Sequence, residues 1–377
     1  MPQPRFIWQR PDWPRFAVDE AAIAMPLKEA RLAQGRVTGK AQALGLEAVG
    51  SATGEIWAAE ALATAAIEGE KLDLDAVRSS VARRLGLPAP AKVGHARDVE
   101  GLLDMMQDAV TRAGQALTRA RLFAWQAALF PTGRSGLVRV RTGGWRTGSE
   151  PMQIVSGPIG REKVHYEAPP ARTVPRLMAG FLRWFEDPAE RGADALVRAA
   201  VAHLWFETVH PFEDGNGRVG RAIVDLALAR DSGVSTPLYR MSSRLAANRK
   251  QYYGELERAQ RGTLDATAWA AWFIGEFGIA CRESEETIDR SLAKARFWAR
   301  RGGVSLSDRQ RKAVNALLEA GPGGFVGGLS AGKYQNLTST SRQTASRDLA
   351  DLVEKGILQV TGQLKGTRYH VVVPEWE

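Results

Sequence analysis

The chain has 377 residues, of which 44% are hydrophobic and 25% are charged, so it is long enough for two or three domains with a sizeable core. No apolar run reaches eighteen residues and the N-terminus lacks the layout of a signal peptide, so we expect no membrane span and a cytoplasmic location. Cys281 is the only cysteine, which excludes an intrachain disulfide and a cysteine metal cluster. The net charge of +9 favours polyanionic partners such as nucleic acid and nucleotides, although an arginine-rich soluble protein has the same balance.

The first block, residues 1–95, is expected to be a helical domain. A strong helix over 53–69 has Thr53 as its expected N-cap and Gly69 as its stop. The prolines and glycines of 85–94 predict a linker. Alanine and leucine at helical spacing predict two earlier helices, over 18–34 and 40–49.

The second block, residues 96–287, is predicted to be a helical core with one β-hairpin inside it. Short alternating runs flank the turn residues Ser156, Gly157 and Pro158, which indicates two antiparallel strands within residues 143–170. The predicted helices of this block cover 97–113, 115–130, 173–187, 193–208, 217–231, 248–261 and 265–287. The fold class is therefore expected to be mainly α.

The third block, residues 300–377, has the element order of a winged helix. Its third predicted helix, over 341–356, is capped by Ser341 and ended by Gly356. The segment ILQVTGQLKGTRYHVVV then predicts two strands around a basic glycine turn. Three helices followed by a hairpin describe a winged helix. The two preceding helices are expected over 306–320 and 329–337.

Two glycine-rich segments match phosphate-binding motifs only in part. Residues 215–220, GNGRVG, satisfy G-x-G-x-x-G, but they follow a predicted helix where a dinucleotide-binding unit requires a strand. Residues 327–333, GGLSAGK, are followed by Tyr334 where a P-loop requires Ser or Thr, and no predicted strand leads into them. We reject both motifs.

The segment HPFEDGNGRVGR, residues 210–221, is suited to holding phosphate. Pro211 ends the preceding helix and the glycines allow a sharp turn, so that a new helix begins near Asn216. The backbone N–H groups at the start of that helix form an anion site. Arg218 and Arg221 lie on one face of its first turns, and the planar arginine fork matches phosphate oxygens.

Three further side chains of this segment supply a base, a metal ligand and an anchor. His210 has an ordinary pKa of about 6.5 and can accept a proton near neutral pH. Asp214 is a hard oxygen ligand that suits Mg²⁺ shared with phosphates, and Phe212 is expected to anchor the loop in the core. These groups suit phosphoryl or nucleotidyl transfer to a hydroxyl group, with His210 as general base. The alternative is a glycine-rich helix cap with an incidental histidine.

The segment resembles the Fic family signature, His-Pro-Phe-x-Asp/Glu-Gly-Asn-Gly-Arg-x-x-Arg, at every specified position. The resemblance covers roughly residues 1–285 and implies a Fic-type helical bundle that transfers AMP from ATP to a hydroxyl side chain of a target protein, with self-modification. It also implies a role for each matched residue. These are His210 as base, Asp214 as Mg²⁺ ligand, Gly215, Asn216 and Gly217 as anion hole, and Arg218 and Arg221 as clamps on the outer phosphates.

The same resemblance extends to the hairpin and to the N-terminus. The hairpin at 143–170 is similar to the family's flap, on which a target segment docks by strand pairing. Residues 153–157, which include Ser156 and Gly157, would form its nucleotide-facing edge. The start FIWQRPDWPRFAVD is similar to a domain found ahead of some Fic cores, and Trp8 and Trp13 are expected to be packing residues within it.

The segment NRKQYYGELERAQ is similar to the helix that closes the adenine pocket in the family. Tyr252 is the expected adenine contact. Gln260, which stands where the family often has Asn, is the second expected contact in this pocket. Tyr253 is expected to pack in the core.

A short motif upstream resembles the family's inhibitory motif, Ser/Thr-x-x-x-Glu-Gly/Asn. In TAAIEG, residues 64–69, Thr64 and Glu68 lie four apart and therefore on one face of a helix. Pairing of Glu68 with Arg221 would make Arg221 unavailable to the γ-phosphate of ATP. In some family members the same glutamate supports removal of AMP from the target, so that activity stays open, and a surface glutamate at a helix end is the alternative.

The tail carries a separate prediction. From residue 300 onward it has 11 Lys and Arg against 7 Asp and Glu, a net charge of +4. We expect it to bind duplex DNA, with protein contact or homodimer formation as the alternative. The expected DNA contacts are Arg342, Gln343, Thr344 and Arg347 at the start of the third helix, and Lys365 and Arg368 on the wing.

Three functions follow from these patterns. The first is a self-inhibited protein adenylyltransferase that uses ATP and Mg²⁺ and docks an unknown target on the flap. The second is a DNA-binding regulator whose core senses nucleotide with little turnover, and the intact His210 and Asp214 argue against it. The third is phosphoryl or phosphocholine transfer on the same scaffold, and the second arginine of the motif, Arg221, argues against a kinase-type relative.

Overall fold

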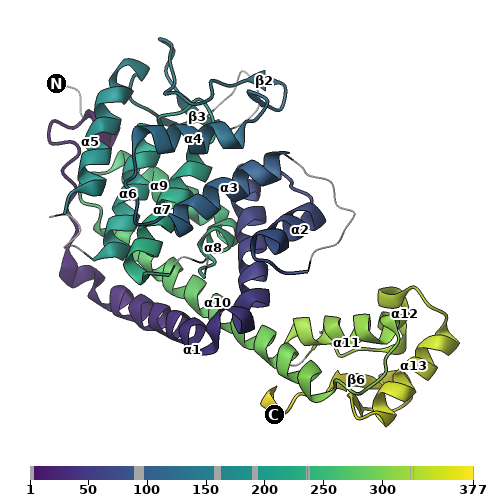
Figure 1. Cartoon of the computed structure of the whole chain (residues 1–377). Coiled ribbons are helices and arrows are strands. Elements are labelled where there is room, and N and C mark those ends of the chain that lie inside the picture. Colours follow the sequence, from purple (N-terminus) through teal and green to yellow (C-terminus); the bar gives the residue numbers. More distant parts are fainter. Residues whose placement is uncertain are drawn as a thin grey trace. The chain divides into compact units, whose positions relative to one another are not determined.

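The computed structural model of the chain consists of two compact units. One comprises residues 1–43 and 53–285, and the other comprises residues 44–52 and 286–377. Figure 1 shows that both are mainly helical, as expected, and the described strands form three two-stranded antiparallel sheets. In the described part of the chain, no helix is long and apolar enough to cross a membrane. The structure describes residues 4–88, 97–156, 163–188, 194–234, 236, 238–322, 324–325 and 327–376.

Helix α1 (Glu20–Ile67) is one continuous helix of 48 residues. Asp19 caps it, because its carboxylate accepts from two N–H groups of the first turn at 2.9 and 3.2 Å. The three separate helices expected over 18–69 are therefore wrong, and Thr53 lies buried inside α1 instead of capping a helix. A glycine inside a helix costs only about 1 kcal/mol, and burial of one face of α1 offsets that cost.

Helices α6 (Ala195–Val209) and α7 (Asn216–Ser232) form the centre of the first unit, where they pack side by side (Figure 1). Almost every residue of α6 is buried, which is typical of a helix surrounded by others. The chain segment between the two helices is the glycine-rich motif, so the fold places that motif at the core. The other helices are α2 (Leu74–Arg84), α3 (Arg97–Thr111), α4 (Arg119–Leu129), α5 (Val174–Glu186), α8 (Met241–Ala247), α9 (Arg249–Arg261) and α10 (Thr267–Arg300).

The helices expected between residues 97 and 287 are all present, with two differences. Helix α8 was not expected, and α10 continues to Arg300 instead of ending near 287. Good helix formers fill the sequence RESEETIDRSLAKARFWAR, and the first glycine after it is Gly302, so no local signal stops α10 earlier. The predicted linker at 85–94 lies mostly outside the described residues.

The predicted flap hairpin is present as β3 (Gln153–Ser156) and β4 (Lys163–Glu167), and its turn, including Gly157, lies outside the described residues. The N-terminal segment holds β4 in place. The ring of Phe6 meets that of Tyr166 edge-on at 5.0 Å, and Trp8 donates from Nε1 to a β4 carbonyl at 2.8 Å. A smaller hairpin, β1 (Arg134–Ser135) with β2 (Val138–Arg139), was not expected.

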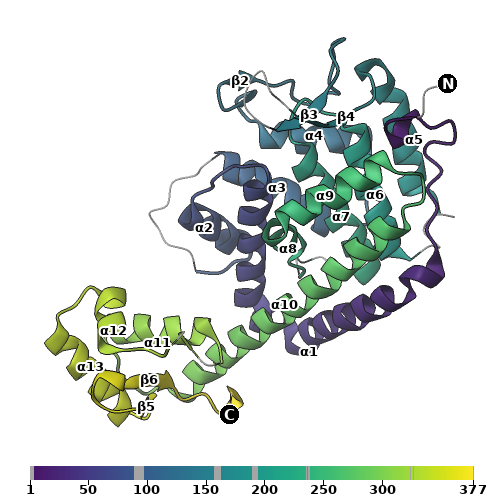
Figure 2. The ribbon, with the colours of Figure 1, turned by 180° about the vertical axis from the view of Figure 1, so that it is seen from behind.

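The second unit has the expected order of three helices and a hairpin (Figure 2). Its apolar core includes Phe297, Leu317, Tyr334 and Leu349. Leu329 pairs with the second strand as an isolated bridge. The assignment of this unit to the winged-helix class stays a prediction. The elements are α11 (Asp308–Ala320), α12 (Ala331–Thr338), α13 (Arg342–Glu354), β5 (Leu358–Thr361) and β6 (Arg368–Val371).

Candidate active site

The turn between α6 and α7 is fixed by its own side chains. His210 ends α6 in a left-handed conformation, with φ +47°, and Pro211 follows it. Phe212 is fully buried, so its expected role as anchor is confirmed. The Asn216 side chain makes two hydrogen bonds to the backbone of Phe212. Its Oδ1 accepts from the Phe212 N–H at 2.8 Å, and its Nδ2 donates to the Phe212 carbonyl at 2.9 Å. The motif alone did not predict this second use of Asn216.

Arg146 holds the end of α6 from the side of the flap. It is 4% exposed, and its Nε donates to the His210 carbonyl at 2.7 Å while Nη2 donates to the Val209 carbonyl at 3.3 Å and to that of Pro169. A cation at a helix C-terminus satisfies the last carbonyls and complements the helix dipole. Arg146 therefore fixes the backbone of His210.

The two arginines of the motif are buried and paired with carboxylates from the end of α1. Arg218 and Arg221 are each 4% exposed. Arg221 Nη2 donates to Glu68 Oε1 at 2.7 Å, and Arg221 Nε donates to Thr64 Oγ1 at 2.7 Å. Arg218 Nη1 donates to both carboxylate oxygens of Glu70, at 2.8 and 2.9 Å. The contact expected between Glu68 and Arg221 is present, and Glu70 provides a second one.

The glycines of the motif make room for this arrangement. A Cβ atom on Gly217 would lie 2.2 Å from Glu68 Oε1 and 3.0 Å from Arg221 Nη1. Gly215 has φ +87°, a conformation that favours glycine, and its N–H donates to Asp214 Oδ1 at 2.5 Å. One of the three amides expected to bind an anion is therefore engaged by Asp214 in this structure.

Asp214 is the one residue predicted to hold a metal. Its side chain is 39% exposed, and Oδ1 lies 3.5 Å from Arg218 Nη2. No three His, Cys, Asp or Glu residues gather into a possible metal site within the described ranges. Mg²⁺ commonly takes only one or two protein carboxylates together with phosphate oxygens and waters. An exposed Asp214 beside a phosphate site fits such a set.

A cavity of about 610 Å³ opens over His210 and Gly217, between the flap and α9. Such a volume suits a nucleotide-sized ligand. Ile154, Val155 and His165 line it from the flap. Ser156 ends β3, but its side chain lies outside the described residues. The cavity therefore joins the predicted base, the predicted anion site and the flap in one space.

The α9 wall of this cavity corrects the sequence prediction for one tyrosine. Tyr252 is 1% exposed, and its hydroxyl lies 2.8 Å from His203 Nε2. Tyr253, expected to pack in the core, is instead 38% exposed, and its hydroxyl donates to the Ile67 carbonyl at 3.2 Å. Helical geometry turns adjacent residues in different directions, and in α9 it is Tyr252 that faces the buried side. Gln260 is 2% exposed, and its Nε2 has no hydrogen-bond partner among the described residues.

Burial sets the protonation states of His210 and Glu207, which both line this cavity. It lowers the pKa of His210 to about 4, with the charge of Arg146 as the next cause. Burial also raises the pKa of Glu207 to about 8, with the charge of Glu68 as the next cause. The two side chains are 3.7 Å apart, between His210 Nδ1 and Glu207 Oε2. His210 is therefore neutral at physiological pH, as a general base must be.

Sequence reasoning missed Arg146, Glu70 and Glu207. Glu207 stands three residues before His210 on a helix, so helical spacing gave a usable signal. Glu70 directly follows the inhibitory motif, and its partner is 148 residues away. Arg146 has no local signal, because its partners are backbone carbonyls of another element.

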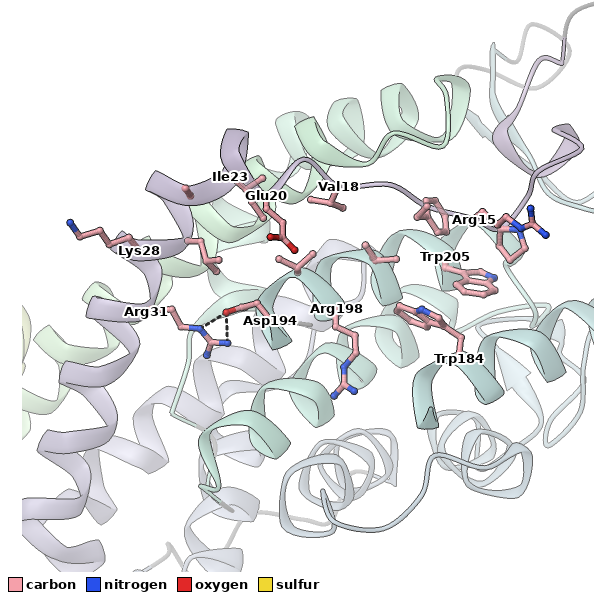
Figure 3. Close-up of a pocket in the computed structure, with 16 residues that line it drawn as sticks. Arg15, Val18, Glu20, Ile23, Lys28, Arg31, Trp184, Asp194, Arg198 and Trp205 are labelled. Carbon is pink, nitrogen blue, oxygen red and sulfur yellow. Dashed lines mark hydrogen bonds and ion pairs between the residues drawn. The ribbon is translucent and has the colours of Figure 1, made fainter. Parts of the chain in front are cut away.

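A second cavity, of about 940 Å³, shares no lining residue with the first. Figure 3 shows it between the N-terminal segment and helices α5 and α6, with Trp184 and Trp205 near Arg15 at one end. The ion pair between Arg31 and Asp194, at 2.9 Å, lies at the other end (Figure 3). The first residues of α1 thus form one wall of a large space against the core.

The structure places the predicted DNA contacts on two elements of the second unit. Arg342, Gln343 and Arg347 are exposed on α13, and Thr344 is half-buried, with its hydroxyl 3.0 Å from the Ser341 hydroxyl. Arg368, expected to face phosphates, donates from Nε to the Gly327 carbonyl at 2.6 Å. The side chain of Lys365 lies outside the described residues.

Comparison with known proteins identifies the core. Residues 116–228 match the Fic/DOC family, a match that includes the whole segment 210–221. The core of the chain therefore contains a Fic/DOC domain. Residues 6–87 match a domain of unknown function, DUF4172. The crystal structure of a Fic family protein from Desulfovibrio desulfuricans G20 is similar, with a TM-score of 0.55 and 25% identity over 95% of this chain and 98% of that one.

Two curated relatives match a shorter part of this chain. The "Probable protein adenylyltransferase aq_aa38" of Aquifex aeolicus (strain VF5) is 31% identical over 99 residues, which is 26% of this chain and 28% of that protein. Protein adenylyltransferase fic-1 of Caenorhabditis briggsae is 34% identical over 87 residues, which is 23% of this chain and 16% of that protein. The chain thus spans less than a third of the length of either relative.

Proposed function

We propose that this Fic family chain transfers AMP from ATP to a hydroxyl side chain of a target protein, and that the end of α1 inhibits the transfer. The observation that carries the proposal is a neutral, buried His210 that lines a cavity together with Gly217 at the N-terminus of α7, where two buried arginines follow. A base beside a preformed anion site is what nucleotidyl transfer to a hydroxyl needs. The names of the two relatives support the same activity.

The chemistry follows from these positions. His210 takes the proton of the target hydroxyl, the freed oxygen forms a bond to the α-phosphorus of ATP, and the bond to the pyrophosphate oxygen breaks. Arg218, Arg221 and the amides at the start of α7 stabilise the charge that collects on the phosphates. Asp214 would hold Mg²⁺, which when bound neutralises phosphate charge. Tyr252 and Gln260 line the part of the cavity where the adenine would lie.

The flap supplies the place for the target. Strand β3 pairs with β4 along one edge, and no other strand of the described residues pairs with it. An extended segment of the target can therefore add to the free edge through main-chain hydrogen bonds. Such docking would bring a hydroxyl side chain over His210, because Ile154 and Val155 of β3 line the same cavity.

The inhibition follows from the arginine contacts. Glu68 occupies Arg221 in the structure, so the arginine is not available to the γ-phosphate, and the Glu68 carboxylate adds negative charge where a phosphate must enter. The Thr64 hydroxyl fixes the same guanidinium from the helix side. Removal of Glu68 should therefore allow ATP to bind productively.

The test uses purified Glu68→Gly protein with Mg²⁺ and ATP labelled at the α-phosphate, beside ATP labelled at the γ-phosphate. The double variant Glu68→Gly/His210→Ala is the blank. Label from the α position on protein, absent in the blank, supports AMP transfer through His210. Label from the γ position alone would contradict it in favour of a kinase. AMP removal is tested by loss of α-label from modified protein over time.

We infer a second function for the C-terminal unit, the binding of duplex DNA. The observation that favours it is the exposure of Arg342, Gln343 and Arg347 along the start of α13, in a unit with the element order of a winged helix. Arg342→Ala/Arg347→Ala should weaken DNA binding by the full chain and reduce its dependence on salt, because fewer counterions are released. Binding unchanged by this variant would contradict the assignment and favour protein contact or homodimer formation.

A further inference from the structure

One carboxyl group in the His210 cavity takes no part in the chemistry described so far. Glu207 lies in the last turn of α6 and is 4% exposed. Its Oε1 has no hydrogen-bond partner among the described residues, and a Cβ atom on Gly220 of α7 would lie 2.4 Å from that oxygen. The core therefore leaves space for a buried carboxyl group that it does not satisfy. Because this is costly, such groups in an active site commonly serve the reaction.

The position of Glu207 relative to the imidazole decides what it can do. Its Oε2 lies 3.7 Å from His210 Nδ1, which is buried and has no hydrogen-bond partner in the described ranges. Nε2 is then the nitrogen left to reach the cavity. A neutral imidazole accepts a proton through one nitrogen only if the other carries the hydrogen, so a base acting through Nε2 needs the hydrogen on Nδ1.

We propose that the Glu207 carboxylate is a positioning residue for His210. It accepts a hydrogen bond from Nδ1–H, which leaves the Nε2 lone pair free to take the proton of the target hydroxyl, and its charge stabilises the imidazolium that results. The present separation exceeds a hydrogen bond, and we expect it to shorten when substrate is bound, as catalytic contacts do. The inference rests on the proposed AMP transfer.

The surrounding charges connect this role to the inhibition. Below its pKa of about 8, the protonated Glu207 would donate to Nδ1 and hold His210 in the tautomer that cannot act through Nε2. Burial is the largest cause that raises this pKa, and the negative charge of Glu68 is the second. The positive charge of Arg221 lowers it. Removal of Glu68 therefore favours the ionised, positioning form of Glu207. The other titratable or charged groups facing the pair are His203, Tyr252, Arg146 and Asp214, and the backbone carbonyl of Glu207 also faces the ring.

The kinetic test introduces Glu207→Gln into the Glu68→Gly protein. Gln has the shape of Glu without its charge, so kcat should fall on the order of 100-fold while KM for ATP and the melting temperature change little. Ionisation of Glu207 requires a pH above its pKa, so kcat of the parent should rise with pH and the variant should lose that rise. Glu213→Gln is the matched control, because Glu213 is an exposed acid in the loop after α6 and accepts from the Arg141 N–H. Unchanged kcat and pH profile in Glu207→Gln would overturn the proposal.

A spectroscopic test does not depend on turnover. The chain has five histidines, so ¹⁵N-histidine spectra are simple, and His210→Ala assigns the His210 signals. Above the pKa of Glu207 the parent should show hydrogen on Nδ1 and none on Nε2, and Glu207→Gln should shift the ring toward a mixture of tautomers. Hydrogen on Nε2 in the parent at that pH would overturn the proposal. A parent with the expected tautomer but no α-label transfer would contradict the proposed function and leave this inference standing.

Discussion

Glu70 should act as a second inhibitory carboxylate, weaker than Glu68. Its two oxygens accept from Arg218 Nη1 at 2.8 and 2.9 Å, and Arg218 is buried over the Phe130 ring, 5.0 Å from its centroid. Arg218 is held in this way only while Glu70 stays in place. Glu70→Gln removes the charge and retains the size, so it should release Arg218 for the phosphates of ATP without opening a cavity.

The size of the effect follows from exposure. A buried hydrogen bond to a charged group contributes about 1.5–3 kcal/mol, so loss of Glu68, whose side chain is 28% exposed, should change ATP affinity by about 2 kcal/mol, or roughly 30-fold. The Glu70 side chain is 38% exposed, so solvent screening reduces its contribution to about 1 kcal/mol, or roughly fivefold. The two effects should not add fully, because both carboxylates lie at one helix end.

The assay measures the ATP dissociation constant and the initial rate of α-label transfer for Glu70→Gln, Glu68→Gly and the double variant. Glu29→Gln is the matched control, since Glu29 is an exposed acid on α1, the helix that precedes Glu70. A Glu70→Gln protein with the affinity and rate of the unmodified chain would refute the reasoning. A fall in affinity would refute it as well, since it would mean that Arg218 needs Glu70 to stay in a binding position.

Three further predictions concern residues that support the site, namely Gly217, Arg146 and Tyr253. Gly217→Ala should lower the melting temperature, because its Cβ would lie 2.2 Å from Glu68 Oε1. The loss should be smaller in the Glu68→Gly background, and equal losses in both backgrounds would contradict the clash. Arg146→Ala should lower the free energy of unfolding by about 3 kcal/mol, because the carbonyls at the His210 turn lose a buried cation. Denaturant titration measures this loss, and an unchanged denaturation midpoint would contradict the prediction. Tyr253→Phe should speed α-label transfer by roughly two- to fivefold, since the hydrogen bond of its hydroxyl to the end of α1 contributes about 0.5–1 kcal/mol. A slower rate would mean that the hydroxyl binds the nucleotide instead.

The sequence determined the parts of the site that depend on neighbours along the chain. Pro211 and the glycines that follow His210 forced a turn between two helices, and the structure has that turn where it was expected. Ser341 and Gly356 bounded the third helix of the tail by cap chemistry, and α13 ends within two residues of the predicted end. These signals are local, so a single sequence contains them in full.

Only the tertiary structure decided which side chains meet. The glycines of α1 indicated breaks, but packing along the core overrides a cost of about 1 kcal/mol per glycine, and one helix results. Glu70 reaches Arg218 over 148 residues of chain, and Glu207 is buried because α7 packs against it at Gly220. The burial that leaves Glu207 protonated near neutral pH is a property of the folded core, since desolvation exists only once the helices have packed.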